Sequence, residues 1–153
     1  MPSPPPVPEL TAHLGFWLRT VSNHVSHAFA EKLAAEGVTV AEWVMLRALY
    51  GKAPMPPSRL ADDMGMTRGA ITKLADRLIG KALMLRRASP DDGRAQTLAL
   101  TPRGTSLVPA LAALADRNDA AFFDHLSAEE RETLERLLKR MVAQSRMTTI
   151  PMD

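Results

Sequence analysis

The middle of the chain concentrates basic side chains, which is the residue chemistry that binding of a polyanion requires. Between residues 58 and 104 the sequence has nine Lys and Arg against five Asp and Glu, whereas the whole chain has 19 against 17. Positive charge gathered on one part of an almost neutral chain is typical of proteins that bind nucleic acid. A charged face that meets only solvent would give the same count, so the elements that carry these residues must decide.

The stretch SPDDGRAQTLALT (residues 89–101) places an arginine where no core is available to it. The segments 83–87 and 96–100 alternate apolar and polar residues around Pro-Asp-Asp-Gly turn chemistry, which predicts a β-hairpin. The apolar positions of the two strands are Leu83 and Leu85, then Leu98 and Leu100. An arginine near a hairpin tip is suited to the narrow minor groove of DNA, so we assign this role to Arg94 and the holding of the turn to Asp92. An isolated turn of this kind would more often carry a solvated arginine.

Two short helices are predicted immediately before this hairpin, at 59–64 and 68–81. Gly65 ends the first helix and Thr67 is a good N-cap for the second, so the pair has the pattern of a helix-turn-helix. The second helix of such a motif enters the major groove with its N-terminal residues nearest the base edges. The hairpin would then be the wing of a winged helix.

The candidate DNA contacts follow from this placement. In the second helix they are Thr67, Arg68, Gly69, Ala70, Thr72, Lys73 and Arg77. Arg68 is expected to contact guanine, Thr72 to reach a base or a phosphate, and Arg77 to meet a phosphate or form an ion pair. Arg86 and Arg87 open the wing on opposite faces of a strand, so at most one of them points at the DNA backbone and the other pairs with a carboxylate.

Long amphipathic helices are predicted on both sides of this unit. A first helix over 10–36 carries apolar residues at steps of three and four, and a helix from Pro102 is followed by another after the capping-box pair Ser127 and Glu130. A second capping box, Thr39 with Glu42, opens the helix before the helix-turn-helix. The outer helices are too apolar on one side for so small a centre, so we predict a homodimer with two-fold symmetry.

The chain length of 153 residues favours one domain. We predict a mainly α fold with a small β-hairpin wing, in which long N- and C-terminal dimerisation helices flank the winged helix-turn-helix core. The expected parts are a Pro-rich lead (1–9), one domain (10–147) with dimerisation helices (10–36 and 102–147) around the winged helix (39–101), and a tail (148–153). With no cysteine, no signal pattern and no apolar run of span length, a cytoplasmic protein without membrane contact is expected.

The stretch LADDMGMTRGAITKLADRLIGKALMLRRASPDDGRAQTLALTPRG (60–104) resembles the winged-helix core of the MarR family of bacterial transcriptional regulators. The most specific match is the wing, in which Asp92-Gly93-Arg94 and Leu100-Thr101 with Gly104 are similar to the family's Asp-x-Arg and Leu-Thr-x-x-Gly patterns. The sequence departs at Ala82, where relatives usually have glycine, so the helix end and the wing strand are expected to differ slightly there.

Members of the family commonly bind small aromatic or phenolic effectors between the dimerisation helices and the winged helix. A stripe on the first helix, at steps of four, three, four and three, fits such a ligand: His13, Trp17, Thr20, His24 and His27. We take the first four as candidate ligand contacts, while the same stripe would equally suit the edge of a dimer interface. His24 and His27 have the spacing of a zinc pair but lack further ligands nearby, so no metal is expected.

The sequence carries no phosphate loop, zinc-protease motif, cysteine or nucleophile elbow, so an enzyme is not expected. The resemblance implies a homodimeric regulator, most often a repressor, that binds a pseudo-palindromic site in double-stranded DNA without a cofactor and is released by a small molecule. The alternative is a winged helix used for protein contact. Loss of the basic residues from the second helix and the wing would mark such a protein, and this chain retains those residues.

Overall fold

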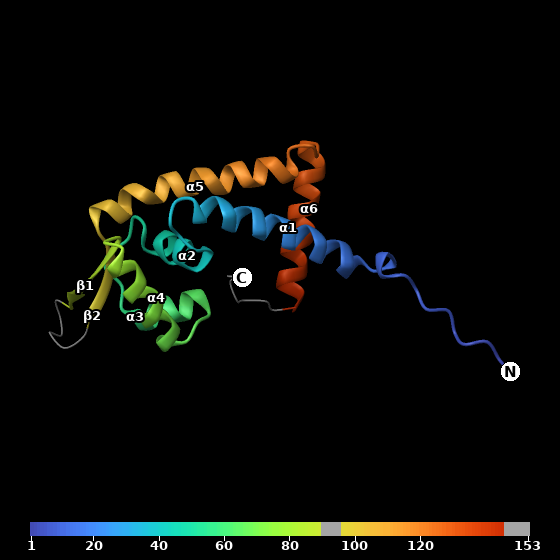
Figure 1. Ribbon diagram of the computed structural model, residues 1–153, viewed down its shortest axis with the longest axis horizontal. Coiled ribbons are helices and arrows are strands. Elements are labelled where there is room, and N and C mark those ends of the chain that lie inside the picture. Colours follow the sequence, from blue (N-terminus) through green and yellow to red (C-terminus); the bar gives the residue numbers. More distant parts are fainter. Residues whose placement is uncertain (90–95, 146–153) are drawn as a thin grey trace.

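The computed structural model describes residues 1–89 and 96–145, and it has a mainly helical fold with one antiparallel hairpin (Figure 1). The elements in chain order are the 3₁₀ turn η1 (Leu10–Ala12), α1 (Leu14–Ala34), α2 (Val40–Leu49), α3 (Pro57–Met64), α4 (Arg68–Gly80), β1 (Met84–Ala88), β2 (Gln96–Leu100), α5 (Pro102–Phe123) and α6 (Ala128–Ser145). This order matches the fold class that the sequence predicts.

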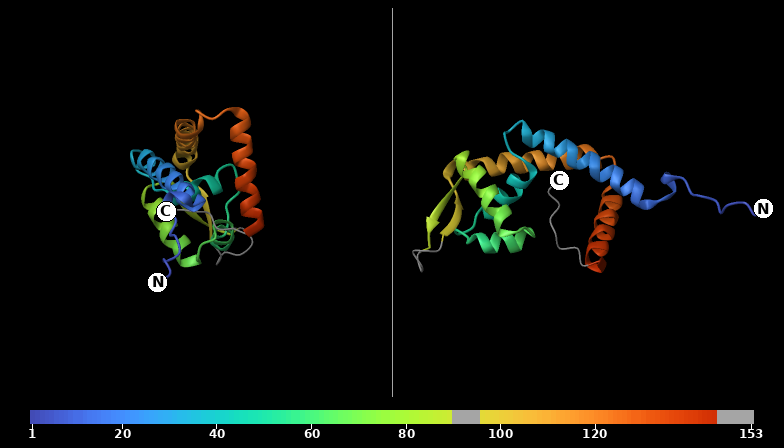
Figure 2. Two further views of the ribbon diagram at one scale, coloured as in Figure 1. Left: turned by 90° about the vertical axis from the view of Figure 1, so that its right-hand side faces the viewer. Right: turned by 60° about the horizontal axis from the view of Figure 1, so that its bottom comes forward.

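The molecule consists of two regions (Figures 1 and 2). We call residues 39–101 the head, and α1, α5 and α6 the arms. α1 and α5 run side by side as long helices above the head, and α6 lies across their end furthest from the wing. Among the described residues, every helix is too short or too polar to serve as a membrane span.

The helix starts are fixed by the local signals that the sequence shows. Thr39 Oγ1 accepts a hydrogen bond from the Glu42 N–H, and Glu42 Oε1 accepts one from the Thr39 N–H, which completes the predicted capping box of α2. Ser127 and Glu130 form the same reciprocal pair before α6. Thr67 Oγ1 accepts from the Ala70 N–H at the start of α4. These caps place α2, α4 and α6 in the register that the sequence predicts.

Three predicted boundaries are wrong, each for a local reason. The helix expected over 10–36 is shorter, because the backbone of His13 is extended between η1 and α1 and the chain turns at Gly37 with φ of +75°. α3 begins at Pro57 rather than Arg59, since proline is well tolerated in a first helical turn. The first wing strand begins at Met84, because the Leu83 N–H still donates to the carbonyl oxygen of Leu78 in α4.

The later start of β1 also changes which of its side chains faces inward. Met84 pairs with Leu100, and Met84 is 2% exposed while Leu85 is only partly buried. Of the four apolar positions named from the sequence, Leu83 and Leu98 are buried, whereas Leu85 and Leu100 are only partly buried.

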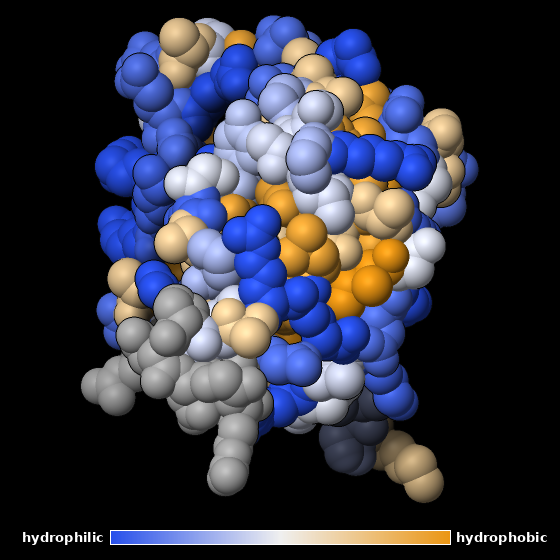
Figure 3. Space-filling model, turned by 90° about the vertical axis from the view of Figure 1, so that its left-hand side faces the viewer, coloured by the Kyte–Doolittle hydropathy of each residue, from blue (hydrophilic) through white to orange (hydrophobic). Residues whose placement is uncertain are grey.

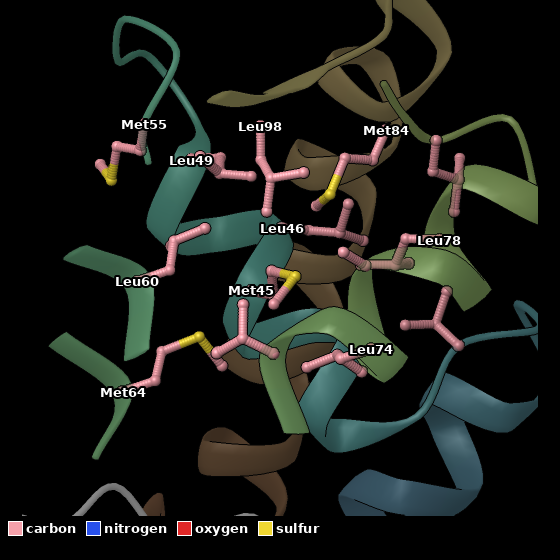
Figure 4. Close-up of a cluster of buried hydrophobic side chains, with 14 of the residues drawn as sticks. Met45, Leu46, Leu49, Met55, Leu60, Met64, Leu74, Leu78, Met84 and Leu98 are labelled. Atoms are coloured by element: carbon pink, nitrogen blue, oxygen red, sulfur yellow. The ribbon is translucent and has the colours of Figure 1, made fainter. Parts of the chain in front are cut away.

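The hydrophobic core lies in the head (Figure 4). Side chains from α2, α3, α4 and both strands converge there, with Leu46 and Met45 of α2 at the centre of the close-up. In the described part of the chain, every fully buried apolar residue falls between Leu33 and Leu111, so only the head-side ends of α1 and α5 join this core. The outer parts of the arms keep their apolar side chains at the surface: Leu14, Trp17, Leu18, Val21, Leu134, Leu138, Met141 and Val142.

Candidate nucleic-acid interface

The helix α4 is held by one face and presents the other to solvent. Its buried residues are Ile71, Leu74, Ala75 and Leu78. α3 precedes it after a tight turn in which Gly65 has φ of +64° and the Met66 N–H donates to the carbonyl oxygen of Ala61. This arrangement is a helix-turn-helix, and it leaves the first turns of α4 free on the outside of the head.

The N-terminal half of α4 carries exposed groups with unused binding capacity. Arg68, Gly69, Thr72 and Lys73 are all exposed, whereas Ala70 is half-buried. Within residues 1–89 and 96–145, Arg68 and Lys73 form no ion pair. The Thr72 hydroxyl donates to the Arg68 carbonyl oxygen at 3.0 Å, so it is free only as an acceptor.

The C-terminal half of α4 differs, because its cations are held by α2. Lys81 Nζ lies 2.8 Å from Glu42 Oε2 and donates to the carbonyl oxygen of Gly37 at 2.7 Å. Arg77 Nη2 donates to Thr39 Oγ1 at 3.4 Å and lies 4.0 Å from Glu42 Oε1. Arg77 thus leans toward the start of α2, and its acidic neighbour is Glu42.

The side chain of Glu42 is 0% exposed, which makes it the one fully buried carboxylate among the described residues. Burial alone would raise the pKa of Glu42, but its hydrogen bonds to Lys81 and Thr39 outweigh that effect and hold the pKa below its ordinary value. Glu42 is therefore ionised at neutral pH. The sequence indicates only a capping role for Glu42, because a capping box does not reveal whether its carboxylate is covered.

The wing separates its two adjacent arginines. Arg86 shares the inward face of β1 with Met84 and forms an ion pair with Asp76 of α4, which confirms that one of the two arginines pairs with a carboxylate. Arg87 lies on the opposite face and is exposed, without an ion pair among the described residues. The predicted groove contacts Asp92 and Arg94 lie outside the described residues.

The joint between α4, the wing and α5 explains the Leu-Thr-x-x-Gly pattern. The Thr101 hydroxyl donates to the Ala82 carbonyl oxygen at 2.7 Å, and the Thr101 N–H donates to the Leu83 carbonyl oxygen at 3.1 Å. Gly104 packs so closely against the same Leu83 carbonyl that a Cβ at this position would overlap it. Glycine at 104 therefore lets α5 begin directly against the base of the wing.

Ala82 adopts the left-handed conformation that glycine usually supplies. Its φ is +60°, its N–H donates to the Ile79 carbonyl oxygen, and the Leu83 N–H donates to that of Leu78, which is a Schellman ending for α4. The helix end is therefore of the ordinary type despite the alanine. Alanine in place of glycine raises the backbone energy at residue 82 alone, because a Cβ disfavours positive φ.

The candidate ligand residues do not all come together. Trp17, Thr20 and His24 line a groove of about 800 Å³ between α1, the end of α5 and α6, but His13 is not among its lining residues. The Trp17 indole N–H donates to the Thr11 carbonyl oxygen and the Thr20 hydroxyl to that of Phe16. His27 lies outside the groove and pairs with Glu31 at 3.2 Å. Across the described residues, no three His, Asp or Glu side chains gather as metal ligands.

The end of the molecule that carries the wing is mostly hydrophilic at its surface (Figure 3). Hydrophilic side chains cover most of this face and frame a smaller hydrophobic area. This face differs from the outer parts of α1 and α6, which expose large apolar side chains such as Leu14, Leu18 and Met141.

Comparison with known proteins gives a consistent result. The MarR family model matches residues 38–95. A protein of Thauera aromatica named for transcriptional regulation of the hcr operon is 34% identical over 140 residues, covering 91% of this chain and 84% of that protein. The HTH-type transcriptional regulator MhqR of Bacillus subtilis is 30% identical and covers 80% of this chain and 82% of its own length.

A solved structure of a MarR variant from Escherichia coli in complex with operator DNA has a similar fold. The TM-score is 0.74 with 27% sequence identity, and the match covers 84% of this chain and 93% of that one. The likeness therefore extends beyond the head to most of the arms.

Proposed function

The chain belongs to the MarR family of transcriptional regulators, and from this premise we propose that it is a homodimeric repressor that binds a specific pseudo-palindromic site in double-stranded DNA. It would act in the cytoplasm, where bacterial chromosomal DNA lies. The observation that carries the proposal is the pair of exposed cations, Arg68 and Lys73, which lack ion-pair partners among the described residues on the free face of a helix-turn-helix.

The arrangement of α4 supports a division of roles in DNA binding. Arg68 stands at the first position of α4, where a guanidinium group is well placed for the bidentate contact with guanine. Lys73 and Arg87 are available for phosphates, and Arg94, which lies outside the described residues, remains our candidate for the minor groove. Thr67 keeps the helix N-terminus in place through its cap on Ala70.

The outer arms support the dimer. Their exposed apolar residues form two stripes, one on α1 and one on α6, that a second copy of the chain would cover. In a two-fold dimer the two α4 helices would reach half-sites about one helical turn apart, roughly 10 base pairs.

We also infer release by a small aromatic or phenolic effector. Trp17, Thr20 and His24 offer an aromatic ring, a hydroxyl and an imidazole in one groove, which is itself lined in part by the apolar stripes of α1 and α6. A compound held there would alter how the two arms meet and therefore the spacing of the α4 helices. The expected weakening of operator binding is about 5- to 150-fold, and a panel of phenolic compounds that shifts affinity by less than about twofold would contradict this part of the proposal.

The proposed function is tested by DNA binding of Arg68→Ala beside wild type. Wild type should select one fragment from its own upstream region, with affinity that falls steeply as salt is raised. Arg68→Ala should lose about 1 to 3 kcal/mol on that fragment and relax the preference at one base position. The matched control is Arg117→Ala, an exposed arginine of α5 outside the head, which should bind as wild type does.

Failure would favour the second candidate function. If wild type selects no fragment and Arg68→Ala binds DNA as wild type does, the specific DNA-binding proposal is wrong. A winged helix that contacts another protein through the same face then becomes the better explanation.

A further inference from the structure

The buried carboxylate of Glu42 joins three elements at the back of α4. It belongs to α2, it binds Lys81 just after the last turn of α4, and Lys81 in turn donates to the Gly37 carbonyl oxygen after α1. Arg77, one turn earlier on α4, lies 4.0 Å from the same carboxylate. We call Glu42, Arg77 and Lys81 the clamp.

The clamp is not explained by stability alone. Placing a carboxylate out of water is costly, and its attraction to Lys81 and Arg77 mainly offsets that cost. An apolar side chain of similar volume at position 42 would serve a core equally well or better. What an apolar side chain would not do is fix the positions of two cations that are themselves about half exposed, at 54% for Arg77 and 41% for Lys81.

The positions of these two cations matter because they border the face of α4 that we assign to DNA. Lys73 precedes Arg77 by four residues, so the two side chains lie about one turn apart on the same side of α4. A flexible arginine side chain at 77 that was not held by α2 would be within reach of the phosphate backbone on which Lys73 acts. Phosphate contacts carry no sequence information, and a freed cation can form them wherever α4 lies on the DNA. They therefore favour binding modes in which α4 makes none of its base contacts, and binding to the wrong sequences gains most.

We propose that Glu42 is a specificity-determining positioning residue: it holds Arg77 and Lys81 against α2 and so keeps their charges off the DNA backbone. This inference rests on the proposed function, since it concerns how the same α4 helix discriminates among sequences. Glu42 touches no DNA itself and acts through the two cations.

The test compares wild type with Glu42→Gln and with the double variant Glu42→Gln/Arg77→Gln. Glutamine at position 42 removes the charge and retains the capping box, because glutamine also accepts the Thr39 N–H at this position of a helix. Two probes are used, a duplex selected by wild type from a random pool and a duplex of scrambled sequence. Circular dichroism first shows that each variant is folded. Dissociation constants are then measured for each protein with each duplex over a series of salt concentrations.

The expected result is a gain in nonspecific binding. Glu42→Gln should bind the scrambled duplex several-fold more tightly than wild type, with a salt slope steeper by about 0.9 for each cation released, or about 1.8 for both. The ratio of affinities for the selected and the scrambled duplex should fall. Removing Arg77 as well should reverse about half of the change in slope.

A folded Glu42→Gln protein with an unchanged salt slope overturns the inference. So does an equal weakening on both probes, which is the behaviour of a residue that only supports the fold. If wild type itself binds neither probe, the proposed function fails and the inference fails with it. That outcome differs from one in which the proteins bind and the ratio of affinities for the selected and scrambled duplexes is unchanged, which contradicts the inference alone.

A second measurement uses wild type alone and does not depend on any variant folding. Lysine acetylation with acetic anhydride, followed by mass spectrometry, reports the exposure of each amine with and without the selected duplex. Lys73 should be protected by DNA, whereas the slow acetylation of Lys81 should be the same in both samples. Protection of Lys81 by DNA to the extent seen at Lys73 would show that the clamp opens on binding, against the inference.

Discussion

The head and the outer arms place their apolar side chains in opposite environments. In the head, Leu46, Leu60 and Leu78 are fully buried by residues of the same chain, whereas on α1 Leu14 is 87% exposed and Trp17 is 52% exposed. On α6, no residue of the described helix is buried. The head is therefore complete within one chain, and the outer arms are completed only by something else, which we propose to be a second copy.

Within the head, some cations are paired and others are not. The head pairs Arg86 with Asp76 and Lys81 with Glu42, and it leaves Arg68 and Lys73 without ion pairs among the described residues. Selective pairing of this kind defines a binding surface more sharply than net charge does. The difference between the two regions suggests that substitutions in the arms will change assembly and that substitutions in the head will change stability and recognition.

The largest effect is expected from a charge placed on the outer arm. Leu18→Glu should dissociate the proposed dimer, because each dimer would lose two buried leucines worth about 1.5 to 3 kcal/mol apiece and would bury two carboxylates. Light scattering coupled to size exclusion should give the mass of one chain. Asn23→Glu, at an exposed polar position on the other side of the same helix, is the control and should remain dimeric; a dimeric Leu18→Glu protein would locate the interface elsewhere.

The second effect is expected from a cavity in the head. Leu46→Ala should lower the free energy of unfolding by about 2 to 5 kcal/mol, since Leu46 is fully buried at the centre of the core. Urea unfolding at one fixed protein concentration measures it. Leu10→Ala, at a residue that is 73% exposed, should change this free energy by less than about 0.5 kcal/mol. Equal losses for both variants would contradict the division into a packed head and open arms.

The third effect tests the joint where the head meets α5. Gly104→Ala should destabilise the protein by about 1 to 3 kcal/mol, because the new Cβ overlaps the Leu83 carbonyl and the backbone must move. Gly80→Ala is the matched control, since a Cβ there meets no atom and alanine favours the helix. The midpoint temperature of thermal unfolding should therefore fall for Gly104→Ala and rise for Gly80→Ala. A rise for both variants would mean that the close contact at residue 104 is relieved at no cost.

The sequence predicted those features of the head and arms that depend on neighbouring residues. Thr39 with Glu42 and Ser127 with Glu130 form their capping boxes, and the strand 96–100 is as predicted, because hydrogen bonds over three residues and alternation over five are local properties. The unpartnered stripes of α1 and α6 could be predicted for the same reason, since helical periodicity alone shows an apolar face.

Features that depend on distant residues could not be predicted. The burial of Glu42 and its contact with Lys81 join residues 39 positions apart, and the contact of Gly104 with Leu83 depends on how α5 approaches the wing. The strand start at Met84 was missed because the Schellman ending of α4 takes Leu83 into the helix cap. Among the candidate site residues, the sequence left open whether Arg77 meets a phosphate or forms an ion pair, because its contacts with Thr39 and Glu42 depend on how α4 packs against α2.

A smaller effect is expected from acid at the clamp. Because the pKa of Glu42 is lower in the folded protein than in the unfolded chain, its ionised form contributes stability that is complete above the unfolded pKa of about 4.3. That contribution is lost as pH falls through the lower folded pKa. The stability difference between wild type and Glu42→Gln, measured in urea at a series of pH values, should be constant near neutrality and shrink below about pH 4. A difference that grows on acidification would contradict the direction of this pKa shift.

The smallest effect is expected at Ala82, where the head departs from its relatives. The left-handed conformation costs an alanine about 1 to 2 kcal/mol, while a glycine there loses about 0.5 to 1 kcal/mol more backbone freedom on folding. Ala82→Gly should therefore raise the free energy of unfolding by roughly 0.5 to 1 kcal/mol. Operator affinity should stay the same, because the Schellman bonds already hold the end of α4 in position. If Ala82→Gly instead lowers stability, the alanine is relaxed at φ +60° and the strain assigned to this joint does not exist.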